Sequence, residues 1–479
     1  MINKTRKLSI TKGLNGTMTQ NRTRIHNEIR IPTETPHNCP MLIHQPEQNL
    51  CNVWQEFTLR STFWLLLLIF IPLANGMAQT RVLIPMDAGQ TNHLKAYGVM
   101  FSHLGEGETG TWLLNYRGGS FLTTNRADIV RKARIRNVQV ELMSESQAQA
   151  LIREVESQGS NTAAVNLEKV PNIAVYTPPQ ALPWDDAVTL ALDYAEVPYD
   201  KLYDREILRG DLQEYDWLHL HHEDFTGQYG KFYAMYRNAP WYIERVNKQK
   251  AMALELGYAK VSALKLDVVL TIKEYIGNGG FLFAMCSGTN TFDIALAARE
   301  LDIVPPEIGG FPMDTNINQR LNYDETLAFT NFSLVNDPFI YQHGNIDVEV
   351  NLNRLSESLD YFTLFDFSAK WDPVPTMLTQ NHVSSIPGFY GQTTAFQKDK
   401  VKPSVVILAE SPGRDQVKYL HGNYGKGTFT FYAGHDPEDY THRVGDPPTD
   451  LSLHVNSPGY RLILNNILFP AAEKKKKET

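Results

Sequence analysis

The pattern of apolar and polar residues predicts a buried strand and a helix joined by a tight turn near the middle of the chain. Phe281–Met285 is a continuous apolar run between a Gly pair and a Ser-Gly, which is typical of a short central strand of a parallel sheet. Apolar residues at helical spacing follow from about Thr289, after hydroxyl and amide residues that favour a helix start. Cys286 occupies the turn between them. A strand–turn–helix with a cysteine at its apex is the pattern of a nucleophile elbow.

Two interpretations of Cys286 are open at this point. The turn would expose the sulfur at the carboxyl end of the strand, where the start of a helix favours negative charge and lowers a thiol pKa toward about 3.5–7.5. Alternatively, Cys286 is a small hydrophobic residue that packs at the end of a strand.

Further strands alternate with helices on both sides of this unit. Apolar runs at residues 173–177 and 215–220 precede helical patterns at residues 183–195 and 264–276. Such alternation predicts an α/β fold with a doubly wound, mainly parallel, flavodoxin-like sheet, whose ligand site lies at the carboxyl ends of the strands. Cys286 and the sequence HHED at residues 221–224 both fall at such ends.

The chain divides into a small and a large domain. Residues 79–165 contain their own strand and helix patterns and predict a smaller N-terminal α/β domain, and a polar linker follows. Residues 170–472 form the predicted large domain. Aromatic and proline-rich stretches without a period, at residues 225–260 and 301–400, are interpreted as insertions, and residues 473–479 as a disordered tail.

A purely apolar run at residues 63–73 indicates export. The run is shorter than the roughly 20 residues that a membrane-spanning helix needs, and it has the length of a signal-peptide core. Residues 58–78 are therefore a signal peptide or an uncleaved anchor, and the expected location is periplasmic or secreted. Residues 1–57 are polar and without period, and are either a disordered extension or a mis-assigned start.

Cysteine usage and charge narrow the expected partners. Cys39 and Cys51 precede the export signal, so cleavage leaves Cys286 as an unpaired thiol. The net charge is −8 and no basic face stands out, so nucleic acid is not an expected partner. Contact with a membrane is expected only through an uncleaved signal. The remaining expectation is a small-molecule, glycan or peptide substrate of the cell envelope.

Late in the chain, the sequence GHDPED supplies the other parts of a thiol hydrolase. In this interpretation Cys286 attacks, His435 acts as the base, and Glu438 or Asp436 orients the imidazole, which are the parts that acyl transfer needs. The N–H group of Ser287 would help to form an oxyanion hole.

The cluster at the end of the strand at residues 215–220 permits a second chemistry. His219 and His221 alternate and share one face of the strand, and imidazole with carboxylate suits zinc or iron. The alternative is a pocket without metal, and no cofactor is expected; His219 and His221 are the candidate ligands if a metal binds. The residues expected to line the pocket are Ser287, Gly288, His221, His222, Glu223, Asp224 and Asp436. A third possibility is a non-catalytic sugar-binding or ligand-binding module.

Residues 173–469 resemble the class I glutamine amidotransferase-like superfamily, on the elbow FLFAMCSGTNTF and the late hairpin followed by GHDPED. The resemblance implies Cys286 as nucleophile and His435 as base. The segment GKGTFTFYAGHDPEDYTH is similar to that of the trehalose-utilisation (ThuA-like) branch. Two features of the sequence depart from the amidotransferase pattern. Asp436 and Pro437 separate His435 from Glu438, and HHEDFTG replaces the glycine-rich oxyanion loop.

The exported part of the chain, including VLIPMDAGQTNHLKAYG, also resembles bacterial envelope proteins that carry the label asparagine synthetase B. The sequence has no Ser-Gly-Gly-x-Asp-Ser pyrophosphate loop, and the residue directly after Met1 is not a cysteine, so synthetase activity is not expected. The predicted function is an exported Cys-dependent hydrolase or amidase acting on an amide or a glycan-linked substrate. The alternative is a non-catalytic carbohydrate- or ligand-binding envelope protein.

Overall fold

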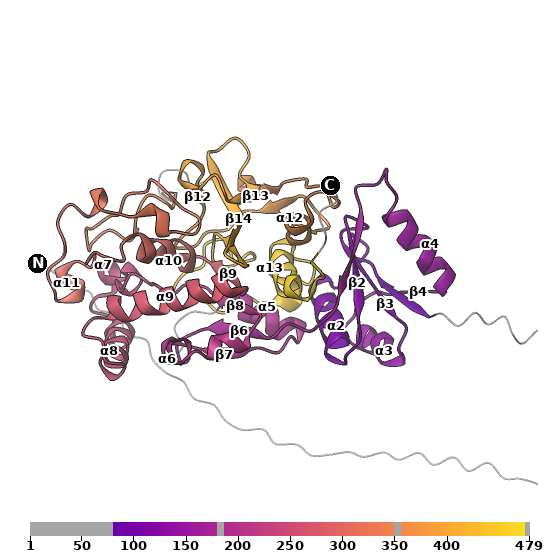
Figure 1. Ribbon diagram of the computed structural model, residues 1–479, viewed down its shortest axis with the longest axis horizontal. Coiled ribbons are helices and arrows are strands. Elements are labelled where there is room, and N and C mark those ends of the chain that lie inside the picture. Colours follow the sequence, from indigo (N-terminus) through magenta and orange to yellow (C-terminus); the bar gives the residue numbers. More distant parts are fainter. Residues whose placement is uncertain (1–79, 180–185, 349–355, 475–479) are drawn as a thin grey trace, which may run out of the picture. The chain divides into compact units, whose positions relative to one another are not determined.

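Two β-sheets organise the computed structural model, which describes residues 80–179, 186–348 and 356–474 (Figure 1). The smaller sheet has five strands in the order β4-β1-β3-β2-β5, and every neighbouring pair is antiparallel. Its strands and helices are β1 Arg81–Ile84, α2 His93–Gly105, β2 Gly110–Leu114, β3 Ser120–Thr124, α3 Ala127–Ile135, β4 Glu141–Met143, α4 Glu145–Val155 and β5 Ala163–Leu167.

The larger sheet has ten strands and is mixed. The order is β11-β10-β13-β14-β15-β9-β8-β6-β7, with β12 beside β14. Pairing is parallel from β7 to β15 and antiparallel from β15 to β11. The strands are β6 Ile173–Tyr176, β7 Asp200–Leu202, β8 Trp217–Leu220, β9 Phe281–Met285, β10 Tyr361–Leu364, β11 Ser385–Pro387, β12 Phe396–Gln397, β13 Val406–Glu410, β14 Gln416–Tyr424 and β15 Gly427–Tyr432.

The prediction of a mainly parallel, doubly wound, flavodoxin-like sheet is therefore wrong. The hairpin of β14 and β15 reverses the strand direction beside β9, and β10, β11 and β12 come from residues 301–400, which were interpreted as an insertion. These three strands are only two to four residues long, too short to show a period of two in the sequence.

Helices cover both faces of the larger sheet, since alternate residues of β9 enter different cores. Phe281, Phe283 and Met285 pack with α2, α5 and α13, whereas Leu282 and Ala284 pack with α9 and α10. The helices of this part are α5 Ala187–Ala195, α6 Asp204–Arg209, α7 Tyr233–Tyr236, α8 Pro240–Glu255, α9 Val261–Asn278, α10 Ser287–Ala297, α11 Pro306–Gly309, α12 Pro373–Leu378 and α13 Pro458–Leu468. Helix α8 lies in the stretch 225–260 that was interpreted as an insertion.

The predicted small and large domains share one hydrophobic core. Helix α2 packs against α5 and α13, which lie between the two sheets (Figure 1). Arg461 of α13 is fully buried there and donates hydrogen bonds to the carbonyls of Met86 and Gly118. The rings of His93 and His382 stack beside it at 4.1 Å. Burial and the charge of Arg461 lower the pKa of His93 to about 4, and burial with the two neighbouring charges lowers that of His382 to about 3.

Among the described residues, none of the helices combines the length and the apolar character needed to cross a bilayer. The predicted signal peptide or anchor at residues 58–78 and the extension at residues 1–57 lie outside the described residues.

Candidate functional site

Cys286 forms a strained turn between β9 and α10. Its φ of 48° and ψ of −136° are unusual for a residue with a side chain and are found where surrounding structure enforces them. The enforcing contact is at Gly288, whose N–H donates a hydrogen bond of 2.5 Å to the carbonyl of His221. A Cβ atom on Gly288 would lie 2.4 Å from that oxygen. Only glycine therefore allows the start of α10 to approach the end of β8 this closely. Helix α10 begins at Ser287 rather than at about Thr289.

The structure brings the side chains of Cys286 and His435 together. The thiol is 2% exposed. Burial raises its pKa, but the hydrogen bond and charge of His435 and the N–H groups of Thr393 and Ser287 outweigh burial, so that the pKa lies below the ordinary value for cysteine. Such surroundings favour the thiolate, which is the nucleophilic form.

The segment that carries Thr393 was not predicted to belong to the site. It lies in the stretch 301–400, and its backbone pairs with the chain after β15. Gly434 N–H donates to the carbonyl of Thr393 at 2.7 Å, and His435 N–H donates to the carbonyl of Tyr390 at 2.8 Å. These bonds hold the two segments together, so that the Thr393 N–H and the His435 imidazole both form hydrogen bonds to the Cys286 sulfur.

Lys418 of β14 holds residues 389–394, the segment that carries Thr393, in place. Its ammonium donates to the carbonyls of Phe389 and Thr394, both at 2.6 Å, and so holds both ends of residues 389–394. Burial lowers the pKa of Lys418 to about 7. Lys418 stands between Val417 and Tyr419, directly before the predicted hairpin. A lysine flanked by apolar residues was the signal that sequence reasoning missed, because a charge is rarely buried without a specific partner.

Several imidazoles surround the base. The ring of His221 lies 4.5 Å from that of His435 and 4.9 Å from that of His222. On another side, His442 stacks on His435 at 4.2 Å, and Asp439 contacts the Nδ1 atom of His442 at 2.8 Å. The predicted pocket residues His221 and His222 thus lie next to the Cys286–His435 pair.

Asp186 contacts two of the histidines at the end of β8, His219 and His221. Its carboxylate lies 3.2 Å from His219 Nε2 and 3.3 Å from His221 Nδ1. Burial raises the pKa of Asp186, but the charges and hydrogen bonds of the two histidines outweigh it and hold the pKa well below the ordinary value. His219 also contacts the carbonyl of Phe283 through Nδ1 at 3.2 Å.

Two sets of residues around His221 and His435 have the spacing to hold a metal ion, and a third set, Asp439, His442 and Asp446, has it too. In each set the candidate ligand atoms lie within 4.8 Å of one another. Imidazole and carboxylate groups suit zinc and similar ions. Rings that stack and contact a carboxylate have the same spacing without a metal, so we assign none. The two sets are His221, His222 and His435, and Asp186, His219 and His221.

The remaining predicted residues lie elsewhere. The carboxylate of Glu438 pairs with His454 at 2.9 Å, a different imidazole from the one it was predicted to orient. The fully buried Asp436 accepts a hydrogen bond from the Glu438 N–H and so shapes the turn. Glu223 lies 3.9 Å from the buried Lys265.

Asp224, the last of the predicted pocket residues, forms an internal pair. Its carboxylate lies 3.3 Å from His343 and accepts a hydrogen bond from the N–H of Gly230 at 2.7 Å. Burial raises its pKa, but His343, Thr226 and Gly230 outweigh burial and lower it below the ordinary value. Asp224 therefore fastens the loop after β8. The sequence HHED divides into two histidines beside the thiol and two acids in structural pairs.

Comparisons with known proteins do not assign this chain to a family. No protein-family model and no curated protein sequence matches it. Similar solved structures include the cytoplasmic proteins STM3548 (12% identity, TM-score 0.33, 64% of this chain and 100% of that chain) and STM1381 (12% identity, TM-score 0.32, 63% and 100%) of Salmonella typhimurium. A GH42 beta-galactosidase is also similar (11% identity, TM-score 0.25, 56% of this chain and 28% of that chain). Similarity at this level supports no assignment, and the resemblance to the glutamine amidotransferase-like superfamily stays a prediction.

Proposed function

We propose that the protein catalyses acyl transfer to the thiol of Cys286 and then hydrolyses the thioester, acting on an amide or an ester. The observation that carries the proposal is the strained elbow, in which the Cys286 thiol meets the His435 imidazole and two backbone N–H groups. A nucleophile, a base and preorganised donors are the minimal parts for this reaction.

In the first half of the reaction, the Cys286 sulfur attacks the carbonyl carbon of the substrate. A carbon–sulfur bond forms, the bond to the amine or alcohol breaks, and the leaving group takes the proton that His435 received from the thiol. In the second half, His435 takes a proton from water, which attacks the thioester carbonyl. The acid product leaves and the thiol regains its proton.

The donors for the developing oxyanion are the N–H groups of Ser287 and Thr393. Both N–H groups already point at the sulfur in the resting site. The oxygen of a carbonyl that the sulfur attacks would therefore lie close to both donors, and the backbone would not have to move. The hydroxyl groups of both residues are buried without a hydrogen-bond partner among the described residues. Buried hydroxyls usually have a partner, and a bound substrate would provide one.

We propose an amide-linked or glycan-linked compound of the cell envelope as the substrate, and an exported location. Both rest on the apolar segment at residues 63–73, which has the length of a signal-peptide core. The competing function, a non-catalytic carbohydrate- or ligand-binding protein, is favoured by the small exposure of the Cys286 thiol.

The test is the reaction of the full-length protein with p-nitrophenyl acetate. We expect a burst of nitrophenolate equal to the amount of protein, and an acetyl group on the peptide that contains Cys286, detected by mass spectrometry. Cys286→Ala abolishes the burst, and His435→Gln slows it by about 100-fold or more, the usual contribution of a general base. A wild-type protein without acetyl-Cys286 would leave the binding function as the better account.

A further inference from the structure

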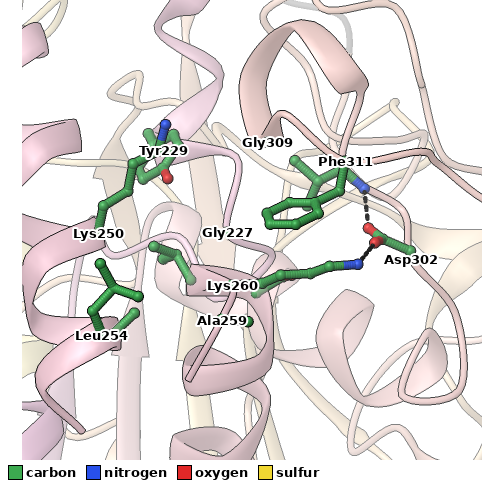
Figure 2. Close-up of a pocket in the computed structure, with 13 residues that line it drawn as sticks. Gly227, Tyr229, Lys250, Leu254, Ala259, Lys260, Asp302, Gly309 and Phe311 are labelled. Atoms are coloured by element: carbon green, nitrogen blue, oxygen red, sulfur yellow. Dashed lines mark hydrogen bonds and ion pairs between the residues drawn. The ribbon is translucent and has the colours of Figure 1, made fainter. Parts of the chain in front are cut away.

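A cavity of about 240 Å³ lies between α8, the start of α9 and the chain that follows α10 (Figure 2). Cys286 and His435 are not among the residues that line it. The cavity therefore has no part in the proposed reaction, and its lining indicates a different ligand.

The cavity carries an uncompensated positive charge. Lys260 points toward Asp302 and pairs with it (Figure 2). Lys250 has neither an ion pair nor a hydrogen bond within residues 80–179, 186–348 and 356–474. Lys250 is exposed at the cavity, so its ammonium is available to an anionic group of a ligand.

The start of α9 adds backbone donors on the same side. The helix runs for 18 residues from Val261, its first turn contains no acidic residue, and Lys260 at the N-cap provides no side-chain acceptor. The first N–H groups of such a helix point outward and favour an anion. Val261 and Ser262 both line the cavity.

Tyr229 gives an independent indication of a ligand. The residue is 2% exposed, and its hydroxyl has no hydrogen-bond partner in the described part of the chain. Figure 2 shows the hydroxyl oxygen pointing into the space that the lining residues enclose. Because the rest of the residue is buried, the cavity is the space from which a ligand could bond this hydroxyl, and Lys250 lines the same cavity.

The rim of the cavity is apolar. Leu254 is 69% exposed and Phe311 is 41% exposed, and both line the cavity. We propose that the cavity binds a small organic anion. Its phosphate or carboxylate group contacts Lys250, the Tyr229 hydroxyl and the first N–H groups of α9, and its apolar body lies on Leu254 and Phe311.

The test is isothermal titration calorimetry of the full-length protein with phenyl phosphate, benzoate, inorganic phosphate and benzyl alcohol. Phenyl phosphate or benzoate binds, whichever anion the site accepts. Inorganic phosphate binds more weakly because it lacks the apolar body, and benzyl alcohol binds more weakly because it lacks the charge.

Variants locate the binding. Lys250→Met lowers the affinity for the organic anion by about tenfold, as expected for the loss of a charge-assisted hydrogen bond. Tyr229→Phe lowers the affinity by about fivefold. Lys248→Met is the matched control, since Lys248 is on the same helix but pairs with Glu244 and does not line the cavity. Three outcomes would overturn the proposal: no binding of either organic anion, equal binding of benzyl alcohol, or an equal effect of Lys248→Met.

Discussion

Replacing Gly288 with alanine tests whether the close approach of α10 to β8 holds the elbow in place. The added methyl carbon would lie 2.4 Å from the carbonyl oxygen of His221, about 1 Å closer than an ordinary van der Waals contact. The obstacle is a backbone atom, so no side chain can rotate away. The helix must shift and the 2.5 Å hydrogen bond from Gly288 to His221 must lengthen.

The expected cost follows from these two effects. Overpacking of a core costs about 1–3 kcal/mol, and weakening a buried hydrogen bond adds about 1 kcal/mol. We therefore expect Gly288→Ala to lower the free energy of unfolding by about 2–4 kcal/mol. Because the shift also moves the N–H of Ser287 and the sulfur of Cys286, alkylation of Cys286 by iodoacetamide is expected to slow by about tenfold.

The control is Gly105→Ala at the end of α2. This glycine has no atom within 4 Å of an added Cβ and no positive φ, so the change should be neutral or stabilise by up to about 1 kcal/mol. Urea denaturation followed by tryptophan fluorescence measures the stability of both variants. If Gly288→Ala has the stability and the alkylation rate of the wild type, the close approach does not shape the elbow.

Three further predictions concern groups around the site and the shared core. Lys418→Met should slow alkylation of Cys286 by about tenfold, because residues 389–394 lose their clamp; an unchanged rate would contradict this role. Glu438→Gln should leave the rate within about twofold, because Glu438 pairs with His454; a large loss would restore its predicted role. Since the folded-state pKa values of His93 and His382 are lowered to about 4 and about 3, the unfolded chain binds more protons below about pH 6.5. The free energy of unfolding, measured in urea, should fall from about pH 6.5 to 4 and be flat above about pH 7; the reverse slope would contradict the buried stack.

The elbow could be predicted from the sequence because its signals are local. Five apolar residues in Phe281–Met285, a small turn and a polar helix start follow one another directly, and all three signals agree. Helix α8 was missed because, of its 16 residues, only Tyr242, Gln249 and Ala253 are buried. So few buried positions leave no apolar stripe to detect.

The sheet direction and most of the site depend on contacts between distant residues. The antiparallel part of the sheet extends through pairs such as that of β10 and β13, which joins Thr363 and Glu410 across more than forty residues of sequence. Thr393, Lys418 and Cys286 meet only through such pairing. No local pattern in the sequence contains this information, because strand order is set by the packing of the whole core.

The most direct test of the proposed thiol chemistry is the pH dependence of Cys286 alkylation by iodoacetamide, measured on the Cys286 peptide by mass spectrometry so that Cys39 and Cys51 do not contribute. Because the His435 side chain and two N–H groups lower the pKa of the thiol, the wild-type midpoint should lie below the ordinary cysteine value of about 8.5, and in His435→Gln it should move up toward that value. An unreactive thiol, or the same midpoint in both proteins, would contradict the pairing of Cys286 with His435.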